Sequence, residues 1–353
     1  MKTEVKKDQI AYAIYFLPGS EEMQLIAGLA EEVSTLIDGE RLKSGFVFAP
    51  YEENKQCPRI IIRSQALISG EEAIVSSFGK VSAACSQRDL LDGQACMSQA
   101  DYETAVAELL HDLSQDDKLG KAVLSRAKEW PLPTNFPLLD FLKRLKKYLP
   151  EAFCFLVCTP QAGLWIGATP EPLLKVKGKH AYTQALAGTL AADGEDQWSE
   201  KELVEQKIVS DYIAENLRKV GVEDCQQSEV KTIQSGAVKH LKTSFKFNIE
   251  DDLSIAKVIE TLHPTPAVCG VPLAAAKAAI KKFEKAPRQY YTGYLGPLGI
   301  GDESHLFVNL RSMHLNAHKA ILYVGAGITV DSVPEKEWLE TQAKAQTLLN
   351  VIQ

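Results

Sequence analysis

Short runs of hydrophobic residues along the chain predict β-strands. Runs rich in β-branched and aromatic residues between turn residues are typical of strands, and KAVLSRAK shows the alternation most plainly. In that run Lys121, Val123 and Ser125 share one face of the expected strand, because successive side chains point to opposite faces. The other expected strands are AYAIYFL, SGFVFAP, RIIIRS, EEAIVSSF, FCFLVCT, GLWIGAT, PLLKVKG, HLKTSFKFNIE, YYTGYLGPLGI, HLFVNLRSMHL and KAILYVGAGIT.

Other segments repeat their hydrophobic residues with the 3.6-residue period of an α-helix. Pro272 stands in the first turn of one of them, where a helix tolerates proline best. Another helix is expected after the turn DSVPE, and it runs to about Ile352. The helix that Pro272 opens covers residues 272–283, and the remaining expected helices cover residues 102–113, 136–149, 198–220 and 252–261.

The order of these elements indicates an α+β fold. Strands come in runs of antiparallel type with helices grouped between them, whereas a parallel α/β sheet needs regular alternation of the two. No linker rich in Pro, Gly or Ser divides the chain, so we expect a single large domain over residues 1–353. Residues 131–137 are the best candidate for a crossing over the surface.

Composition and charge argue against several classes of protein. The 353 residues are 45% hydrophobic and 24% charged, which is ordinary for a globular protein with a sizeable core. A net charge of -7 argues against a nucleic-acid partner, but an anionic substrate needs only a local cluster of cations. No run approaches the roughly 18 apolar residues of a membrane helix, and we find no signal peptide. We therefore expect a cytoplasmic protein without a membrane partner.

The seven cysteines are scattered along the chain and form no C-x-x-C pair. Cys154 and Cys158 lie four residues apart in the run FCFLVC, so they share one face of a strand. We expect the cysteines to be core thiols in a reducing compartment, rather than metal ligands or disulfides.

Two helical segments contain glutamates with more than one interpretation. In WSEKELVEQKIVSDYIAENL, Glu205 lies in line with the apolar stripe, and a carboxylate turned towards a core is costly unless it is paired or bound to a metal. The alternative is a glutamate at the helix edge that reaches water. In the last helix, Glu340 can pair with Lys344, four residues later. Glu337 and Thr341 have the same spacing. The pattern alone favours surface pairs in that helix.

A glycine-rich segment, GAGIT at residues 325–329, follows the expected strand AILYV. Glycines let the backbone approach a ligand closely and present N–H groups to an anion, but the third glycine of a dinucleotide-binding loop is absent. The sequence contains no H-E-x-x-H, G-x-S-x-G or G-x-x-x-x-G-K-[ST] motif, which disfavours zinc hydrolases, serine hydrolases and P-loop proteins. Motifs alone do not exclude pyridoxal phosphate.

Eight blocks in fixed order resemble a known family, the chorismate-utilising enzymes. The family includes isochorismate, salicylate, anthranilate and aminodeoxychorismate synthases. The resemblance runs from about Lys121 to the C-terminus, so residues 116–353 correspond to the catalytic part and residues 1–115 are less typical. The blocks are KAVLSR, ATPEPLLKV, ALAGTL, KELVEQKIVSDYI, TLHPTPAVCGVP, YYTGYLGPL, VNLRSMHL and VGAGITVDSVPEKEWLETQAKAQTLL.

The resemblance implies a single α+β domain of two large, mainly antiparallel β-sheets packed together with helices outside, as in anthranilate synthase component I. Several blocks distinguish the branches of the family. Lys121 falls where members that use water keep a lysine, whereas anthranilate synthases typically have glutamine there. Ala187 of ALAGT falls where aminodeoxychorismate synthases carry a nucleophilic lysine. TLHPTPAVCG resembles the isochorismate synthase version of its block.

By this resemblance the protein is expected to be an isochorismate synthase, an isomerase that converts chorismate to isochorismate. Lys121 is implied as the general base for water attack at C2, and Glu171 as the general acid for the departing C4 hydroxyl. Glu205 and Glu340 are implied as ligands of Mg2+. The implied substrate-binding residues are Gly188, Thr189, His263, Tyr291, Arg311, Gly327 and Lys344.

Two alternatives to this hypothesis stay open. A salicylate synthase shares the lysine and would continue from isochorismate by eliminating pyruvate. A chorismate-binding protein without catalysis is the alternative from another class. We further expect a monomer without a glutaminase subunit, in menaquinone rather than siderophore biosynthesis. One departure from the family pattern is Gln289 after Arg288, where an acidic residue or glycine is common, and it predicts a loosened contact behind the site.

Overall fold

The computed structural model describes residues 10–85, 95–115, 119–192, 197–235 and 238–352. The strands are β1 (Ile10–Phe16), β2 (Met23–Glu32), β3 (Ile37–Asp38), β4 (Arg41–Leu42), β5 (Gly45–Ala49), β6 (Ile60–Ser69), β7 (Lys121–Pro131), β8 (Phe153–Thr159), β9 (Gly163–Thr169), β10 (Pro172–Lys177), β11 (His180–Ala191), β12 (Gln226–Gln227), β13 (Lys231–Ser235), β14 (Val238–Asn248), β15 (Gly270–Val271), β16 (Tyr294–Leu298), β17 (Glu303–Val308), β18 (Ser312–Leu315) and β19 (Lys319–Ile328). The helices are α1 (Glu71–Cys85), α2 (Gln99–Gln115), α3 (Leu138–Tyr148), α4 (Glu200–Lys219), α5 (Asp252–Leu262), α6 (Leu273–Phe283) and α7 (Pro334–Ile352).

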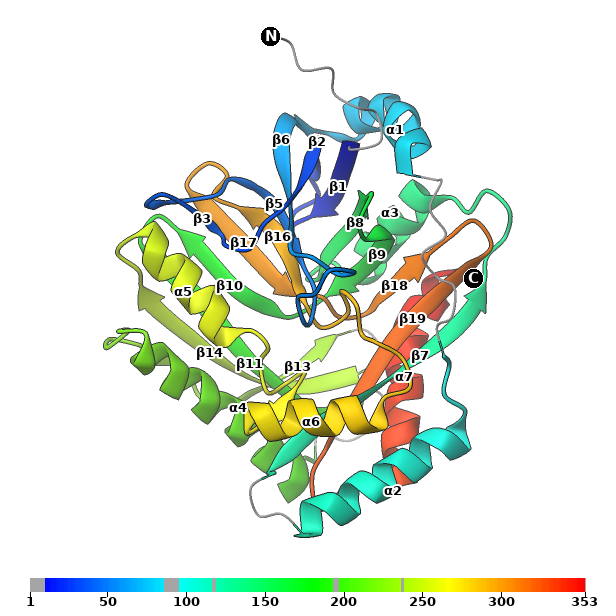
Figure 1. The fold of residues 1–353 in the computed structure, drawn as a ribbon, viewed down its shortest axis with the longest axis vertical. Helices are drawn as coiled ribbons and strands as arrows, with labels where there is room; N and C mark the ends of the chain where they lie inside the picture. The colour runs from blue at the N-terminus through cyan, green and yellow to red at the C-terminus, as the bar shows by residue number, and fades with distance from the viewer. Residues whose placement is uncertain (1–9, 86–94, 116–118, 193–196, 236–237, 353) are drawn as a thin grey trace.

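Seventeen of the strands form one hydrogen-bonded network, and its named strands pair antiparallel. From one end to the other the order is β15, β7, β19, β18, β9, β8, β1, β2, β6, β5, β16, β17, β10, β11 and β14, with β12 and β13 both on β14. The network curls, so that β7 and β19 at one end and β11 and β14 at the other line opposite sides of one pocket (Figure 1). The antiparallel sheet with helices outside it confirms the predicted α+β class.

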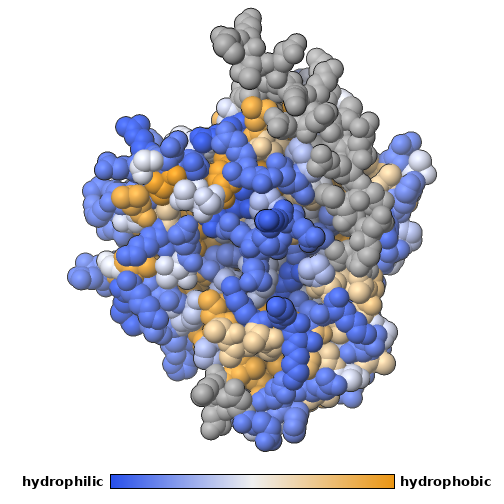
Figure 2. Space-filling view, viewed as in Figure 1, coloured by the Kyte–Doolittle hydropathy of each residue, from blue (hydrophilic) through white to orange (hydrophobic). Residues whose placement is uncertain are grey.

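The hydrophobic core has a central part between the two halves of the sheet and three outer parts under the helices. Aromatic rings fill the centre, where Phe153 of β8 stacks on Phe307 of β17 with ring centroids 4.3 Å apart. Helices α4 and α5 cover β10, β11 and β14, while α3 and α7 cover β8, β9, β18 and β19. Helices α2 and α6 pack on β7 and β19 (Figure 1). The face of the molecule in Figure 2 is mostly hydrophilic, with apolar surface over α6.

One predicted strand is wrong, because EEAIVSSF begins helix α1. Ile74 and Phe78, four residues apart, face the sheet, and the Phe78 ring lies 5.9 Å from the ring of Tyr12. Val75 between them is 48% exposed. A short apolar run fits either period, and packing on β1 selects the helix. The sequence did not predict strands β2, β11 and β13, which have 10, 12 and 5 residues.

The run HLFVNLRSMHL forms two strands, β17 and β18, instead of the single strand expected. The chain leaves the extended conformation between them, where Arg311 has a φ of 46°. A non-glycine residue in the left-handed region is uncommon and points to a position held by its surroundings. The interruption turns Arg311 out of the ladder of the sheet.

Among the cysteines whose side chains the structure describes, five follow the expectation and Cys158 does not. Cys57, Cys96, Cys154, Cys225 and Cys269 are free thiols. Cys158 is disulfide-bonded instead, which corrects the expectation of thiols throughout. In the part of the chain that the structure describes, no helix combines the length and apolar character that a membrane span requires.

Candidate active site

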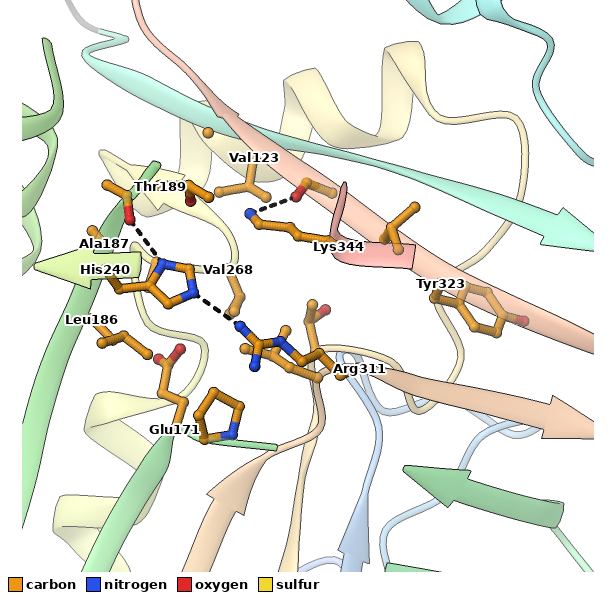
Figure 3. Close-up of a pocket in the computed structure, with 18 of the residues that line it drawn as sticks. Val123, Glu171, Leu186, Ala187, Thr189, His240, Val268, Arg311, Tyr323 and Lys344 are labelled. Carbon is orange, nitrogen blue, oxygen red and sulfur yellow. Dashed lines mark hydrogen bonds between the residues drawn. The ribbon is translucent and has the colours of Figure 1, made fainter. Parts of the chain in front are cut away.

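The pocket between the two ends of the strand network contains about 700 Å³ of empty space, part of it open to solvent. Val123 of β7 lies at the top of the pocket, and Leu186 of β11 and His240 of β14 lie at its left (Figure 3). Residues 187–189 of β11 and Gly327 of β19 also line the pocket. Its walls are largely apolar with a few charged and polar groups between them, which is typical of pockets for small molecules.

The structure brings most of the residues expected from the sequence to this pocket. Lys121 and Glu340 do not line the pocket themselves, but each forms an ion pair with a residue that does. His263 lies elsewhere. The expected residues that line the pocket are Glu171, Gly188, Thr189, Glu205, Tyr291, Arg311, Gly327 and Lys344.

Lys121 and Glu205 form a buried ion pair beside the pocket. The Lys121 side chain at the start of β7 is fully buried, and its Nζ lies 2.9 Å from Glu205 Oε1 on α4. Gly327 of β19 makes room for the pair, because a Cβ at that position would lie 2.5 Å from Glu205 Oε1 and 2.9 Å from Lys121 Cε. The glycine of GAGIT therefore permits a close approach of side chains, which the sequence did not indicate.

Glu205 belongs to a group of alternating charges that we call the carboxylate–lysine cluster. Lys201 of α4 pairs with Glu337 of α7 at 2.5 Å, and Lys344 pairs with Glu340 at 2.7 Å. Burial acts to raise the pKa of Glu205, but Lys121, Lys201 and Lys344 hold it below its usual value. The cluster consists of Glu205, Glu337, Glu340, Lys121, Lys201 and Lys344.

Two members of the cluster, Lys201 and Glu337, were not predicted as site residues. The sequence suggested a pair of Glu337 with Thr341, but the Thr341 hydroxyl donates to the Trp338 carbonyl and accepts from Arg126. Burial and the charge of Glu340 raise the pKa of Glu337 to about 7. The pairing of α4 with α7 depends on tertiary packing, so helical spacing could not reveal it.

Glu205 and Glu340 suit a hard cation. Mg2+ keeps several waters and is usually bound through one or two carboxylates together with substrate oxygens. The side chains of Glu205 and Glu340 are 12% and 18% exposed. Each carboxylate contacts a lysine ammonium, so a positive charge already lies beside each of them. Among the described residues, no group of three or more His, Cys, Asp or Glu side chains is arranged to hold a metal ion.

Glu171 lies on the other side of the pocket, in the short connection between β9 and β10. Its side chain is 2% exposed. Burial raises the pKa of Glu171 to about 8, although the charges of Lys121 and Lys344 act against the shift. The carboxyl group therefore keeps its proton at neutral pH, as a general acid must.

Arg311 is held by a histidine that the sequence did not single out. His240 Nε2 lies 2.9 Å from Arg311 Nη2, and His240 Nδ1 lies 2.8 Å from the Gly188 carbonyl oxygen (Figure 3). A carbonyl oxygen only accepts and a guanidinium only donates, so Nδ1 carries the proton and Nε2 accepts. Burial and the charges of Arg311 and Lys344 lower the pKa of His240 to about 3, which keeps the ring neutral.

Two further residues shape the pocket wall. Tyr291 stacks on Tyr323, with ring centroids 5.5 Å apart, and both rings line the pocket. Ala187 also lines the pocket. Its methyl group stands where aminodeoxychorismate synthases were expected to carry a nucleophilic lysine. The pocket thus offers no amine at that place.

His263, which was expected near the substrate, does not line this pocket. His263 follows α5, and its ring packs edge-on against Tyr294 with centroids 5.0 Å apart. Burial lowers the pKa of His263 to about 4. His240 takes the place in the pocket. One signal could have indicated it, because His240 lies on the face of β14 that carries Lys242 and Ser244, and Phe245 and Phe247 on the other face join the core.

The chain is similar in sequence to known enzymes. Residues 52–353 match the family described as chorismate binding enzyme. An isochorismate synthase MenF of Haemophilus influenzae is 30% identical over 244 residues, which cover 66% of this chain and 56% of that relative. The isochorismate synthase DhbC of Bacillus subtilis is 30% identical over 274 residues, covering 71% and 67%. The chain thus spans little more than half the length of the first of these relatives.

A solved structure shows the same fold. MenF of Escherichia coli, a menaquinone-specific isochorismate synthase, superimposes with a TM-score of 0.75 at 18% identity, covering 100% of this chain and 92% of that one. The family match begins well before Lys121, so the less typical first part of the chain also contributes to it from residue 52. The chain belongs to the chorismate-binding enzyme family.

Proposed function

We propose that the protein is an isochorismate synthase. The observation that carries the proposal is the buried carboxyl of Glu171, which lines the same pocket as Glu205 of the Lys121–Glu205 pair. An acid and a base on opposite sides of a small pocket suit a reaction that changes two separate carbon atoms of one ring. The names of the relatives support this choice within the family.

The proposed reaction moves a hydroxyl group from C4 to C2 of chorismate. Lys121 first gives up the proton that it holds in its ion pair with Glu205, and then takes a proton from a water molecule whose oxygen attacks C2. The ring double bonds shift, and the C4–O bond breaks as Glu171 donates its proton to the leaving hydroxyl. One water enters and one leaves, so substrate and product are isomers. Lys121 then holds a proton and Glu171 has lost one, and exchange with solvent restores both.

The remaining pocket residues suit the two carboxylates of chorismate. The Arg311 guanidinium, oriented by His240, is a planar donor for one carboxylate. Lys344 and Tyr291 add a cation and a hydroxyl to the same pocket. Glu205 and Glu340 would hold Mg2+, and the bound ion would supply positive charge for the ring carboxylate. We propose magnesium dependence on this basis.

The test is to incubate the purified protein with chorismate, with Mg2+ and then with EDTA, and to resolve the products by chromatography. Isochorismate formed only with the metal is the expected result. Salicylate with pyruvate would move the protein to the salicylate synthase branch while keeping the acid and base roles. Absence of turnover, with ammonia also tested as nucleophile, would contradict the proposed enzyme and favour a binding protein without catalysis.

The destination of the product is a separate proposal. We propose menaquinone biosynthesis, supported by the name of the Haemophilus influenzae relative. The Vibrio cholerae relative, named a vibriobactin-specific isochorismate synthase, supports the siderophore alternative. Deletion of the gene followed by measurement of menaquinone and of catechol siderophores would decide between them, because only the product of the affected route disappears.

A further inference from the structure

Behind the pocket wall lies a second buried ion pair, Arg288 with Glu284 at the C-terminal end of α6. Their side chains are 2% and 5% exposed. Burial acts to lower the pKa of Arg288, but the charge and hydrogen bonds of Glu284 hold it above its usual value. A buried pair of this kind contributes little to stability by itself, because desolvation of both charges offsets their attraction. Its position therefore calls for another reason.

The guanidinium of Arg288 uses its donors on backbone groups of the pocket wall. Nη1 donates to the Val268 carbonyl at 2.6 Å, and Nη2 donates to the Val123 carbonyl at 2.7 Å. Nη1 also lies 3.3 Å from the Thr292 hydroxyl. Val123, Val268 and Thr292 all line the pocket, whereas Arg288 itself does not. One side chain thus joins three separate segments of the wall from behind.

Glu284 also binds the backbone of β7, two residues after Val123. Its Oε1 accepts a hydrogen bond from the Ser125 backbone N–H at 2.7 Å, and both of its oxygens accept from Arg288 Nε. The Gln289 carbonyl accepts from the Tyr51 N–H at 3.0 Å, and the loosened contact expected at this position stays a prediction.

The pair takes the place of a neighbouring strand along one edge of β7. Strand β15 pairs only with residues 121–122 of β7, and the Cys269 carbonyl accepts from the Val123 N–H at 2.8 Å. In a strand, the N–H and the carbonyl of one residue point to the same edge, and every second residue uses that edge. The Val123 carbonyl and the Ser125 N–H therefore face the edge of β7 beyond the end of β15. Arg288 and Glu284 satisfy these two groups, which would otherwise be buried without partners.

We propose that Arg288, oriented by Glu284, is a positioning residue that sets where β7 carries Lys121 relative to the pocket. Lys121 lies two residues before Val123 on this strand. A planar guanidinium can reach two carbonyls and a carboxylate at once, whereas an ammonium acts as a single point of charge. Displacement of a reacting group by about 1 Å can lower a rate roughly 100-fold. The kinetic part of this inference rests on the proposed function, and the positional part does not.

The test compares Arg288→Lys with Arg59→Lys. Arg59 is also buried and pairs with Glu53 and Glu260, but its bonds reach no residue of the pocket. We expect Arg288→Lys to lower kcat roughly 10- to 100-fold with KM for chorismate within about threefold. Arg59→Lys should keep kcat within about twofold of the wild-type value, even if its melting temperature falls as much as that of Arg288→Lys. Equal losses of kcat in both variants at equal melting temperatures would overturn the proposal.

A second readout does not depend on turnover. Hydrogen exchange of a peptide covering residues 121–126 should be at least about tenfold faster in Arg288→Lys, because the Ser125 N–H loses its anchored partner, and unchanged in Arg59→Lys. Unchanged exchange in Arg288→Lys would overturn the proposal. If that variant does not fold, Glu284→Gln, which keeps the shape and removes the charge that orients Arg288, should change both readouts in the same direction. If the wild type does not convert chorismate, the proposed function fails, and hydrogen exchange still decides the positional part.

Discussion

Glu171 and Glu205 are two carboxyl groups buried in the wall of one pocket, and the protein holds them in opposite protonation states. Both lie within the field of Lys121 and Lys344. Glu205 also contacts Lys121 directly at 2.9 Å, and this contact keeps its pKa low against the effect of burial. Glu171 has no such ion pair among the described residues, and burial prevails there.

The comparison shows how one site can hold a proton donor and an anion at neutral pH. A charge at direct contact outweighs desolvation, while the same charges farther away only reduce it. Glu171 can therefore supply a proton, and Glu205 can accept a cation. The difference resides in the neighbours that the fold supplies, since the two side chains are chemically identical.

Removal of the proton on Glu171 should have the largest effect. Glu171→Gln keeps the shape and the neutral charge of the protonated acid but cannot release a proton to the leaving hydroxyl. We expect kcat for isochorismate formation to fall roughly 1,000-fold with little change in KM, within the range for loss of a general acid. Steady-state kinetics measures both, with exposed Glu200→Gln as the control. A loss of kcat below tenfold would argue against the acid role.

Removal of the negative charge of Glu205 should weaken the binding of Mg2+. Glu205→Gln deletes one carboxylate for Mg2+ and leaves the buried Lys121 ammonium without its partner. We expect the Mg2+ concentration for half-maximal rate to rise more than about tenfold and kcat to fall roughly 100-fold. Calorimetric titration with Mg2+ checks the binding without turnover, again beside Glu200→Gln. An unchanged metal affinity would remove Glu205 from the proposed ligands.

Two glycines of β19 provide a matched pair that tests the Lys121–Glu205 contact. A Cβ in Gly327→Ala meets Glu205 Oε1 at 2.5 Å and Lys121 Cε at 2.9 Å, so both side chains of the pair must shift. In Gly325→Ala the nearest atoms are the Leu124 carbonyl oxygen at 3.1 Å and Ser125 Cβ at 3.2 Å, which need only a small shift. We expect kcat to fall roughly 10- to 100-fold in the first variant and less than about fivefold in the second. Equal effects would mean that the contact is not required.

Two amide variants separate the contributions of the two hydrogen bonds that His240 makes. In His240→Gln the side-chain oxygen can replace Nε2 as the acceptor for Arg311, and in His240→Asn the amide nitrogen can replace Nδ1 as the donor to Gly188. If the orientation of Arg311 matters for the substrate, KM should rise roughly tenfold in the Asn variant and about threefold or less in the Gln variant. The reverse order would assign the role to the Gly188 contact.

The smallest expected effect is the pH dependence of the wild type. Glu171 acts in its protonated form, and its pKa of about 8 lies above its usual value, so activity should be constant near pH 7 and about half of that value at pH 8. Above pH 8 the rate should fall about tenfold per pH unit. His240, with a pKa of about 3, should contribute no step between pH 5 and 8. Activity that rises through pH 8 and above would contradict the assignment of Glu171.

The elements that could be predicted are those whose pattern is local. The strands FCFLVCT, GLWIGAT and PLLKVKG lie where expected, because alternation and turn residues are read from a few neighbouring positions. Helix α1 was missed because packing on β1, and not its own pattern, decides its period. His240 was missed because its partner Arg311 is 71 residues away in the chain.

The sequence by itself determined the α+β class, the family, and the identity of Lys121, Glu171, Glu205 and Glu340 as candidates, since ordered blocks and local periods carry that information. Only the tertiary structure decided which carboxyl keeps its proton and which lysine contacts which glutamate. Lys201 and Glu337, for example, are 136 residues apart and meet only when α4 and α7 pack against the two ends of the sheet. Burial and direct contact set the charge of an ionisable group, and both depend on the folded chain.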